Sequence, residues 1–190
     1  MKRIALAILM LSFLSWPEAS LAESPELMEA FLQGRNLYKE GRYKEATTSY
    51  ENALELGERE LGPDHQSMAT ISNELALLYR IQGRYGDAEP LFKRSLAIYE
   101  KALGPDHLSV AISLNNLATL HQAQGRYGDA EPLFKRSLAI NEKVLSTDHL
   151  SVAISLNNLA GLYQTQGRYA AAEPLYKRSL EIMEKALGPD

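Results

Sequence analysis

The sequence contains no cysteine among its 190 residues. Without thiols, the chain cannot form a disulfide framework, a thiolate metal site or a thiol nucleophile. The fold must therefore be held together by the packing of side chains. Apolar residues make up 45% of the chain, which is enough to build the core of one folded domain.

Long runs of like charge are also missing. The net charge is −4, both signs are interspersed along the chain, and no run of five or more like charges occurs. The sequence therefore has neither an acidic tail nor a polybasic arm, which argues against a nucleic acid partner.

The usual signatures of catalysis and of cofactor binding are absent as well. The chain has no glycine-rich phosphate loop and no pair of carboxylates outside a repeated segment. His65, His107 and His149 each follow an aspartate, but a catalytic triad has no reason to be copied along a chain. Each copy also offers a single imidazole with no third strong metal ligand nearby. The sequence thus predicts a protein that is not an enzyme and that carries no cofactor or metal.

The first 22 residues differ in composition from the rest. Lys2 and Arg3 precede an apolar stretch at residues 4–14, and the small residues Ser20 and Ala22 close the segment. This order is typical of a secretory signal peptide. An apolar helix over residues 4–14 would span only ~16 Å, about half of a bilayer core, so no stable membrane anchor is expected. We expect cleavage near Ala22 and export, either to a bacterial periplasm or by secretion.

The remaining residues repeat with a period of 42. The segment GRYGDAEPLFKRSLAI occupies residues 83–98 and again 125–140, and the variant GRYAAAEPLYKRSLEI begins at residue 167. Residues 23–190 number 168, or four times 42, and divide into units of about 24–65, 66–107, 108–149 and 150–190. Such self-similarity predicts a stack in which each unit buries the apolar face of its neighbour.

Each unit is expected to contain two helices. In the third unit, apolar residues recur at helical spacing over 108–124 without glycine or proline, and Gly125 provides a turn. A second helix is expected over about 129–145, with Asp129 as its N-cap and Pro132 in its first turn. The loops between units end in aspartates that we expect to cap the following helix, namely Asp64, Asp106 and Asp148.

The residues of the third unit resemble the tetratricopeptide pattern. The matching positions are Leu117, Ala118, Gly125, Tyr127, Ala130, Phe134, Ser137 and Leu138. The second and fourth units match in the same way, whereas the first has Gln33 and Gly34 in place of the Leu-Ala pair. The period of 42 and the segment LNNLA are similar to the kinesin light chain subclass. This resemblance implies an all-α, right-handed superhelical stack of antiparallel helix pairs, a tetratricopeptide solenoid.

The resemblance also implies a peptide-binding groove along the first helix of each unit. The groove positions carried onto this chain are Asn73, Asn115, Asn157, Asn116, Asn158, Arg80, Gln122, Gln164 and Thr119. An amide offers both a donor and an acceptor, so a ladder of amides could bind an extended peptide backbone. The alternative is that one asparagine of each pair satisfies a buried carbonyl group, with Asn116 and Asn158 as the structural members.

Two charge patterns remain open to a functional or a structural interpretation. Arg35 and Lys39, together with Arg80, could contact a peptide carboxylate at one end of the groove. The recurring Lys-Arg pairs could bind phosphate or anionic lipid, but a glutamate four residues before each lysine favours a solvated, neutralised surface.

The sequence therefore predicts an exported protein-protein interaction module that binds an extended segment of a partner. The alternative is a self-assembling structural element, or the repeat portion of a larger protein, because no polar capping helix follows the last unit. The last helix could then dock a second copy through Leu175, Ile182 and Met183, giving a homodimer.

Overall fold

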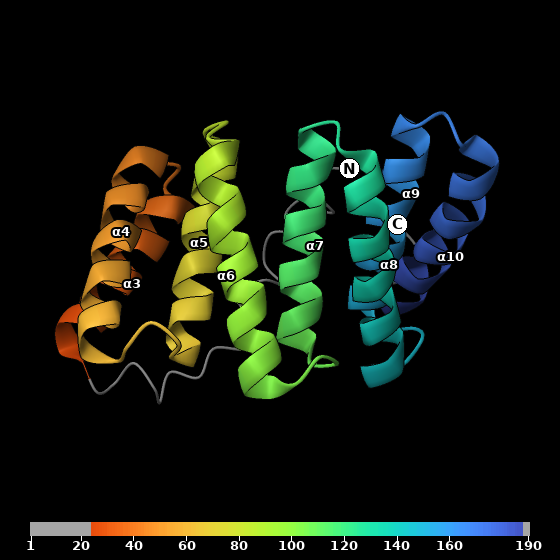
Figure 1. The fold of residues 1–190 in the computed structure, drawn as a ribbon. Helices are drawn as coiled ribbons and strands as arrows, with labels where there is room; N and C mark the ends of the chain where they lie inside the picture. The colour runs from red at the N-terminus through yellow and green to blue at the C-terminus, as the bar shows by residue number, and fades with distance from the viewer. Residues whose placement is uncertain (1–23, 188–190) are drawn as a thin grey trace. The chain divides into compact units, whose positions relative to one another are not determined.

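The computed structural model describes residues 24–187, so the signal-peptide prediction for residues 1–22 lies outside the described part of the chain. Within residues 24–187 the regular elements are all helices (Figure 1). They are α3 Pro25–Lys39, α4 Tyr43–Glu60, α5 Gln66–Ile81, α6 Tyr85–Leu103, α7 Leu108–Ala123, α8 Tyr127–Val144, α9 Leu150–Thr165 and α10 Tyr169–Leu187. The prediction of an all-α fold is confirmed.

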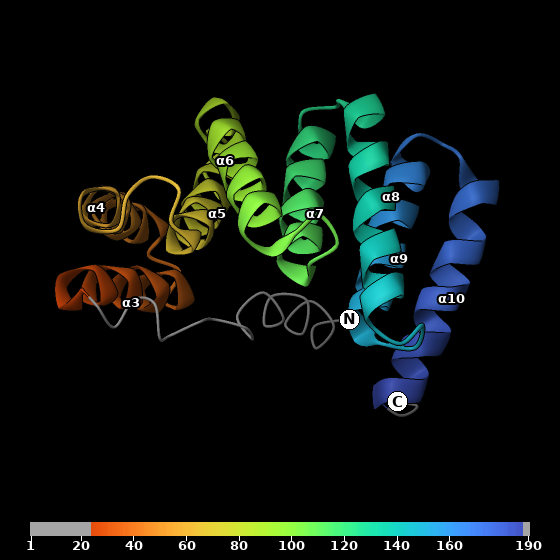
Figure 2. The same ribbon diagram turned by 60° about the horizontal axis from the view of Figure 1, so that its bottom comes forward.

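The helices form two compact units, divided between Pro105 and Asp106. The N-terminal unit contains α3 to α6, in which α3 packs on α4, α4 on α5, and α5 on α6. The C-terminal unit contains α7 to α10 with the same order of packing, and α7 also contacts α9 directly. Figure 2 shows the antiparallel pairs within each unit. Each unit is thus a stack of two helix pairs, and we call the first helix of a pair helix A and the second helix B.

The A helices that follow an inter-repeat loop begin at a histidine and not at the predicted aspartate. The backbone N–H of Ser109 donates to Nδ1 of His107 at 3.1 Å, and that of Ser151 donates to Nδ1 of His149 at 3.1 Å. His65 caps α5 in the same way. The prediction of aspartate N-caps is therefore wrong.

The three aspartates instead form ion pairs with a lysine of the following B helix. Lys101 Nζ lies 2.6 Å from Asp64 Oδ2, and equivalent pairs join Lys143 to Asp106 and Lys185 to Asp148. Each repeated aspartate therefore ties a loop to the helix pair that follows it.

The turn between helix A and helix B depends on a glycine in the left-handed region. Gly125 has a φ of 74°, and the N–H of Arg126 then reaches back to the carbonyl of His121 at 2.8 Å. The helix α8 that follows starts at Tyr127, without a side-chain cap. Asp129 binds Arg126 Nε at 2.9 Å instead of capping the helix, so that prediction is also wrong. Pro132 lies inside α8, beyond the first turn that the sequence predicted.

The core of the C-terminal unit forms where α8 packs on α9. Phe134 is 1% exposed and packs in one cluster with Leu159, Leu162 and Tyr163. A second cluster joins α9 to α10 within their pair, where Ile182 packs with residues of α9. Helix B therefore uses one apolar face within its own pair and another against the next pair.

The packing of the first pair explains why glycine stands at residue 34, where the later repeats have alanine. A Cβ added to Gly34 would lie 3.0 Å from the ring of Tyr50, which packs edge-on against Phe31. Glycine at residue 34 therefore makes room for the buried tyrosine of the neighbouring helix B.

Candidate interaction surfaces

The asparagines of the C-terminal unit link its two A helices. Asn158 on α9 donates from Nδ2 to Oδ1 of Asn115 on α7 at 2.8 Å. This hydrogen bond spans successive repeats, because the two residues are 43 positions apart. One amide of each asparagine pair is thus used between helices, while Asn115 still has its own amide protons to donate.

The other predicted groove residues of this unit differ in how their side chains are used. Asn157 and Gln122 are partly buried, and their amides make no hydrogen bond to another described residue, whereas Asn116 has a partner. The hydroxyl of Thr119 donates to the backbone carbonyl of Asn115 in its own helix. Gln164 accepts a hydrogen bond from the hydroxyl of Tyr176 at 2.8 Å. Asn157 and Gln122 are therefore the two predicted groove amides of this unit that make no hydrogen bond at all to another described residue.

The N-terminal unit carries charge where the C-terminal unit carries amides. Asn73 and Glu74, at the positions of Asn115 and Asn116, are only 5% and 6% exposed. Burial raises the pKa of Glu74 to about 7, although a hydrogen bond from Asn73 opposes the rise. Glu74 can therefore exchange a proton near neutral pH.

Two arginines of this unit retain donors without a partner. The Nε atoms of Arg35 and Arg80 are buried and make no hydrogen bond among the described residues. Burial raises the pKa of Tyr38 on α3, the charge of Glu74 adds to the rise, and the charge of Arg80 opposes it. Arg80 on α5 thus lies close enough to α3 to act on the same group, whereas Lys39 is exposed at the end of α3.

The repeated Lys-Arg pairs are matched by carboxylates. Lys135 binds Glu131 at 2.7 Å, and this hydrogen bond holds the pKa of Glu131 at about 2. Lys93 and Lys177 bind the equivalent glutamates at 2.7 Å and 2.6 Å. Arg178 reaches Glu142 of the preceding helix B at 2.5 Å. These contacts favour the interpretation as a neutralised surface over a phosphate-binding stripe.

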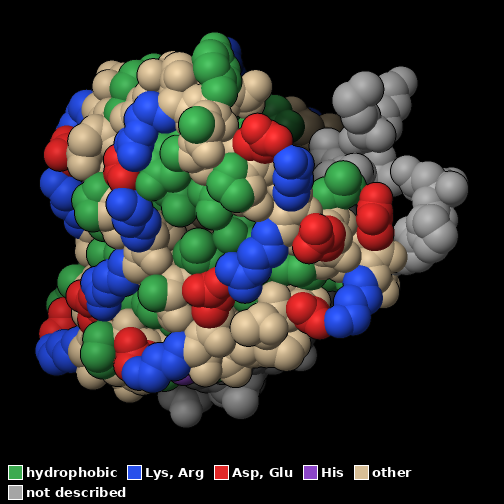
Figure 3. Space-filling model, turned by 90° about the vertical axis from the view of Figure 1, so that its right-hand side faces the viewer, with side chains coloured by type: hydrophobic (Ala, Val, Ile, Leu, Met, Phe, Trp, Pro, Cys, Tyr) green, Lys and Arg blue, Asp and Glu red, His purple; other side chains and the backbone are tan. Residues whose placement is uncertain are grey.

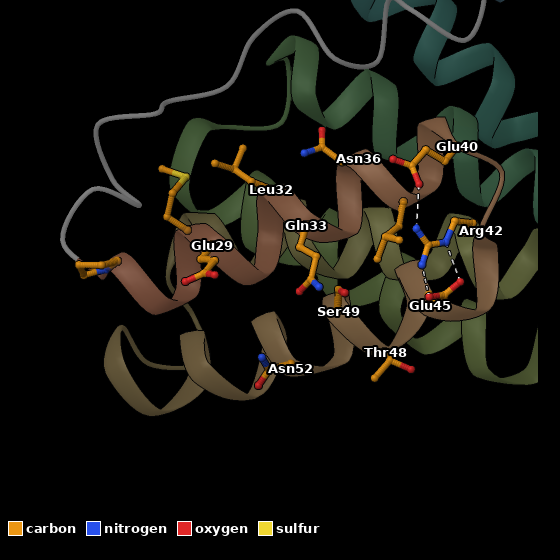
Figure 4. Close-up of a pocket in the computed structure, with 13 residues that line it drawn as sticks. Glu29, Leu32, Gln33, Asn36, Glu40, Arg42, Glu45, Thr48, Ser49 and Asn52 are labelled. Atoms are coloured by element: carbon orange, nitrogen blue, oxygen red, sulfur yellow. Dashed lines mark hydrogen bonds and ion pairs between the residues drawn. The ribbon is translucent and has the colours of Figure 1, made fainter.

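The outer face of the first pair is a groove that polar side chains line together with Met28, Leu32 and Leu37. Its lining side chains include Glu29, Gln33 and Asn36 from α3 and Ser49 and Asn52 from α4 (Figure 4). Arg42, which precedes α4, binds Glu40 at 2.9 Å near one end of this groove. Glu29, Gln33 and Asn36 give this surface a more polar character than the equivalent faces of the later A helices, as expected for a repeat at the end of a stack.

The last described helix presents an apolar face (Figure 3). Leu180 and Tyr169 of α10 are 54% and 68% exposed. Both line a shallow pocket with Ala172, Tyr176 and Lys177. Figure 3 shows hydrophobic side chains gathered at the centre of this side, with Lys, Arg, Asp and Glu around them.

The predicted docking residues of α10 need correction. Ile182 is 4% exposed because it packs on Val152 and Leu156 of α9, and Leu175 and Met183 pack partly against the same cluster. The exposed positions are Tyr169 and Leu180, which sequence reasoning missed. Comparison with residues 42 positions earlier could have found them, because Tyr127 and Leu138 pack against the cluster between α8 and α9.

The described residues offer neither a cluster of metal ligands nor a membrane-spanning helix. Within residues 24–187, no three His, Cys, Asp or Glu side chains are placed to hold a metal ion. No described helix is long and apolar enough to cross a membrane.

Comparisons with known proteins agree with the fold. The sequence pattern of the tetratricopeptide repeat family matches residues 26–101, 67–143 and 109–185. The crystal structure of BtubC (BKLC) from P. vanneervenii is similar with a TM-score of 0.79 and 23% identity, over 86% of this chain. This chain spans 65% of the length of that protein.

Two further structures are of a kinesin light chain-like protein from Podosopora anserina with nearly identical TPR-like repeats, one of them a single-residue variant. They have TM-scores of 0.74 and 0.70 and identities of 27% and 28%. The similarity covers 90% and 88% of this chain, and 84% and 82% of those chains. No curated protein matches the sequence.

Proposed function

Because the chain belongs to the tetratricopeptide repeat family, we propose that it is a non-enzymatic interaction module whose A helices bind an extended segment of another protein. Members of this family are generally protein-interaction modules. The C-terminal unit supports this proposal through the unused amides of Asn157 and Gln122.

Amides suit an extended peptide because its backbone alternates N–H donors and C=O acceptors. The hydrogen bond between Asn158 and Asn115 holds one amide of each pair in place, which orients the surface before a ligand arrives. Peptide contacts of this kind are individually modest, so the affinity would come from several rungs used together.

The N-terminal unit would make a different kind of contact with a peptide. The unpaired Nε donors of Arg35 and Arg80 support contact with an acidic group, with Lys39 exposed one turn beyond Arg35. Glu74 and Arg80 both act on Tyr38, so an ionised Glu74 would repel an acidic group bound near Arg80. We therefore propose carboxylate contacts at this end, strongest when Glu74 is protonated.

The test is photo-crosslinking in cells from a benzophenone amino acid at Gln122, followed by mass spectrometry. The control position is Lys135 on α8, whose side chain is 55% exposed and lies on a helix B. A partner captured from residue 122 and not from residue 135 is the expected result.

The variant Asn157→Ala refines this test because it removes an amide that makes no hydrogen bond within the described residues. It should reduce capture at least about tenfold while leaving the melting temperature unchanged. Equal capture from both positions, or capture that Asn157→Ala does not change, would contradict the peptide-binding proposal.

Export is a separate proposal, supported by the charged, apolar and small-residue order of residues 1–22. N-terminal sequencing of the protein recovered from cells should give Glu23 as the first residue. An intact N-terminus would contradict it.

Self-assembly is the second candidate function. The exposed apolar side chains of α10 favour it, because contiguous apolar surface of this kind marks interaction sites.

A further inference from the structure

The apolar face of α10 corresponds by repeat position to a face of α8, and α9 covers that face of α8 within the same chain. On α8, Ala130 and Phe134 are buried where α9 packs on them. Forty-two residues later, Ala172 and Tyr176 occupy the same positions on α10. We call Tyr169, Ala172, Tyr176, Leu180 and Met183 the α10 face. Tyr169 and Leu180 are exposed, Tyr176 and Met183 are partly buried, and Ala172 is only 3% exposed but lines the shallow pocket. No described helix follows α10 to cover this face.

The A helix that begins the described chain does not fit this face. The leucines that pack against a preceding helix B are Leu159 and Leu162 in α9. The corresponding residues of α3 are Gln33 and Asn36, both exposed in the groove of the first pair. Head-to-tail docking of α10 on α3 of another copy would therefore bury two amides against apolar side chains, which is unfavourable.

Among the described residues, the α10 face holds the two most exposed large apolar side chains, Tyr169 and Leu180. The three others, Tyr43, Ile81 and Val144, lie singly on three different helices. The surface of a second copy that best matches the α10 face is consequently the α10 face itself.

We propose that the α10 faces of two copies pack against each other in an isologous dimer, with antiparallel helices that cross at Tyr176. This inference rests on self-assembly as the second candidate function. Tyr176 and Leu180 are four residues apart, the spacing of a ridge that packs into the groove of a facing helix, and Ala172 lines the shallow pocket next to them. A twofold axis at Tyr176 sets Leu180 of each copy against the small Ala172 of the other, and Tyr169 against Met183.

The charges beside this ridge are also self-complementary. Glu173 and Lys177 form an ion pair at 2.6 Å on one edge of the α10 face. Antiparallel crossing near Tyr176 brings the same edge of the second copy alongside in the opposite direction. Glu173 of each copy then lies near Lys177 of the other, so unlike charges face each other across the interface.

Sedimentation equilibrium of the purified chain, from about 1 to 100 μM, measures the association. We expect a monomer-dimer equilibrium, and Leu180→Lys should raise the dissociation constant at least about 100-fold, because the charge enters the interface twice. Val144→Lys is the matched control, since Val144 is 48% exposed on helix B of the preceding pair. Should Leu180→Lys fold poorly by circular dichroism, Tyr169→Lys replaces it, because Tyr169 is 68% exposed.

The absence of cysteine provides a test of the crossing point. In Tyr176→Cys, the single introduced thiol can form a disulfide only with its counterpart in another copy, and this requires the two Cα atoms to lie within about 7 Å. We expect a covalent dimer on mild oxidation, and none from Val144→Cys.

Sedimentation and disulfide formation together distinguish self-assembly in general from dimerisation through the α10 face. A chain that is monomeric throughout the concentration range overturns both. A dimer that persists in Leu180→Lys, or that forms no disulfide through residue 176, leaves self-assembly intact but overturns the α10 interface. Neither outcome bears on peptide capture from Gln122, which tests another surface.

Discussion

Single residues distinguish repeats that are otherwise close copies. Asn116 and Asn158 are amides, but the same position in the second repeat is Glu74. Glu74 is 6% exposed, and its charge acts on Tyr38 and Tyr50 in this part of the N-terminal unit. A charged carboxylate at this position is disfavoured by its burial.

This burial predicts a pH-dependent loss of stability. The pKa of Glu74 is about 7 in the folded chain, whereas the ordinary value of 4.5 applies in the unfolded chain. Below pH 4.5 the carboxyl group is protonated in both states and does not change the free energy of unfolding. As the pH rises from 4.5 through 7, the unfolded chain releases the proton more readily, and the folded state is destabilised by up to about 3 kcal/mol. Glu74→Gln should remove this loss.

Urea unfolding of both proteins at pH 4 and pH 8 checks the prediction. The free energies of unfolding should differ little at pH 4 and by about 3 kcal/mol at pH 8, with the variant more stable. A difference of the same size at both pH values would show that Glu74 does not titrate in this window.

At the scale of the helix, the turns of the repeats were predicted better than their caps. Gly125 has the positive φ that the sequence indicates. The N-cap was assigned to Asp106 because aspartate is a common cap, but His107 follows it and its Nδ1 accepts the same kind of bond. A local pattern that offers two adjacent acceptors does not decide which one faces the helix, because the long-range partner Lys143 draws Asp106 away.

The same limit applies to the faces of α10. The apolar periodicity of a helix shows which residues avoid water, but helix B has two apolar faces with different partners. Ile182 was expected to be exposed and is buried within its own pair, whereas Leu180 is exposed. The repeat register separates the two faces, because each residue can be compared with the residue 42 positions earlier.

Two glycines three residues apart provide a prediction at this scale. Gly125→Ala should destabilise the fold by about 1 to 2 kcal/mol, because its φ of 74° suits glycine. Gly128→Ala should stabilise it by about 0.5 to 1 kcal/mol, because Gly128 lies within α8 and an added Cβ would meet no atom within 4 Å. The next repeat already has alanine there, at Ala170.

Thermal unfolding monitored by circular dichroism measures both changes. The melting temperatures should move in opposite directions. A decrease for Gly128→Ala would indicate that the glycine serves a contact outside the described residues.

At the scale of the whole molecule, the repeats supply nearly identical surfaces and the first and last helices supply the differences. The family, the 42-residue period and the helix pairs could be predicted from the sequence because every unit repeats the same information. The amides on the outer face of α3 and the exposed face of α10 depend on the fact that no other described helix covers them, which repetition alone does not indicate. On each face, a few residues differ from those at the same position of the other repeats. In α3, for example, Gln33 and Asn36 stand where the later repeats have leucine.

Because the outer faces of α3 and α10 do not match each other, substitutions in α3 should change whether the chain forms polymers. Gln33→Leu with Asn36→Leu would give α3 the two leucines that α9 uses to pack on α8. The altered α3 face should then accept the α10 face of another copy, and such a heterologous contact leaves a free α3 and a free α10 at the ends of every oligomer. We expect light scattering of the double variant to grow with protein concentration without reaching a limit at the dimer. Adding Leu180→Lys should abolish this growth, whereas Gln33→Ser with Asn36→Ser should never produce it. Growth that survives Leu180→Lys would mean that the new leucines associate with each other and that the amides on the outer face of α3 do not govern head-to-tail docking.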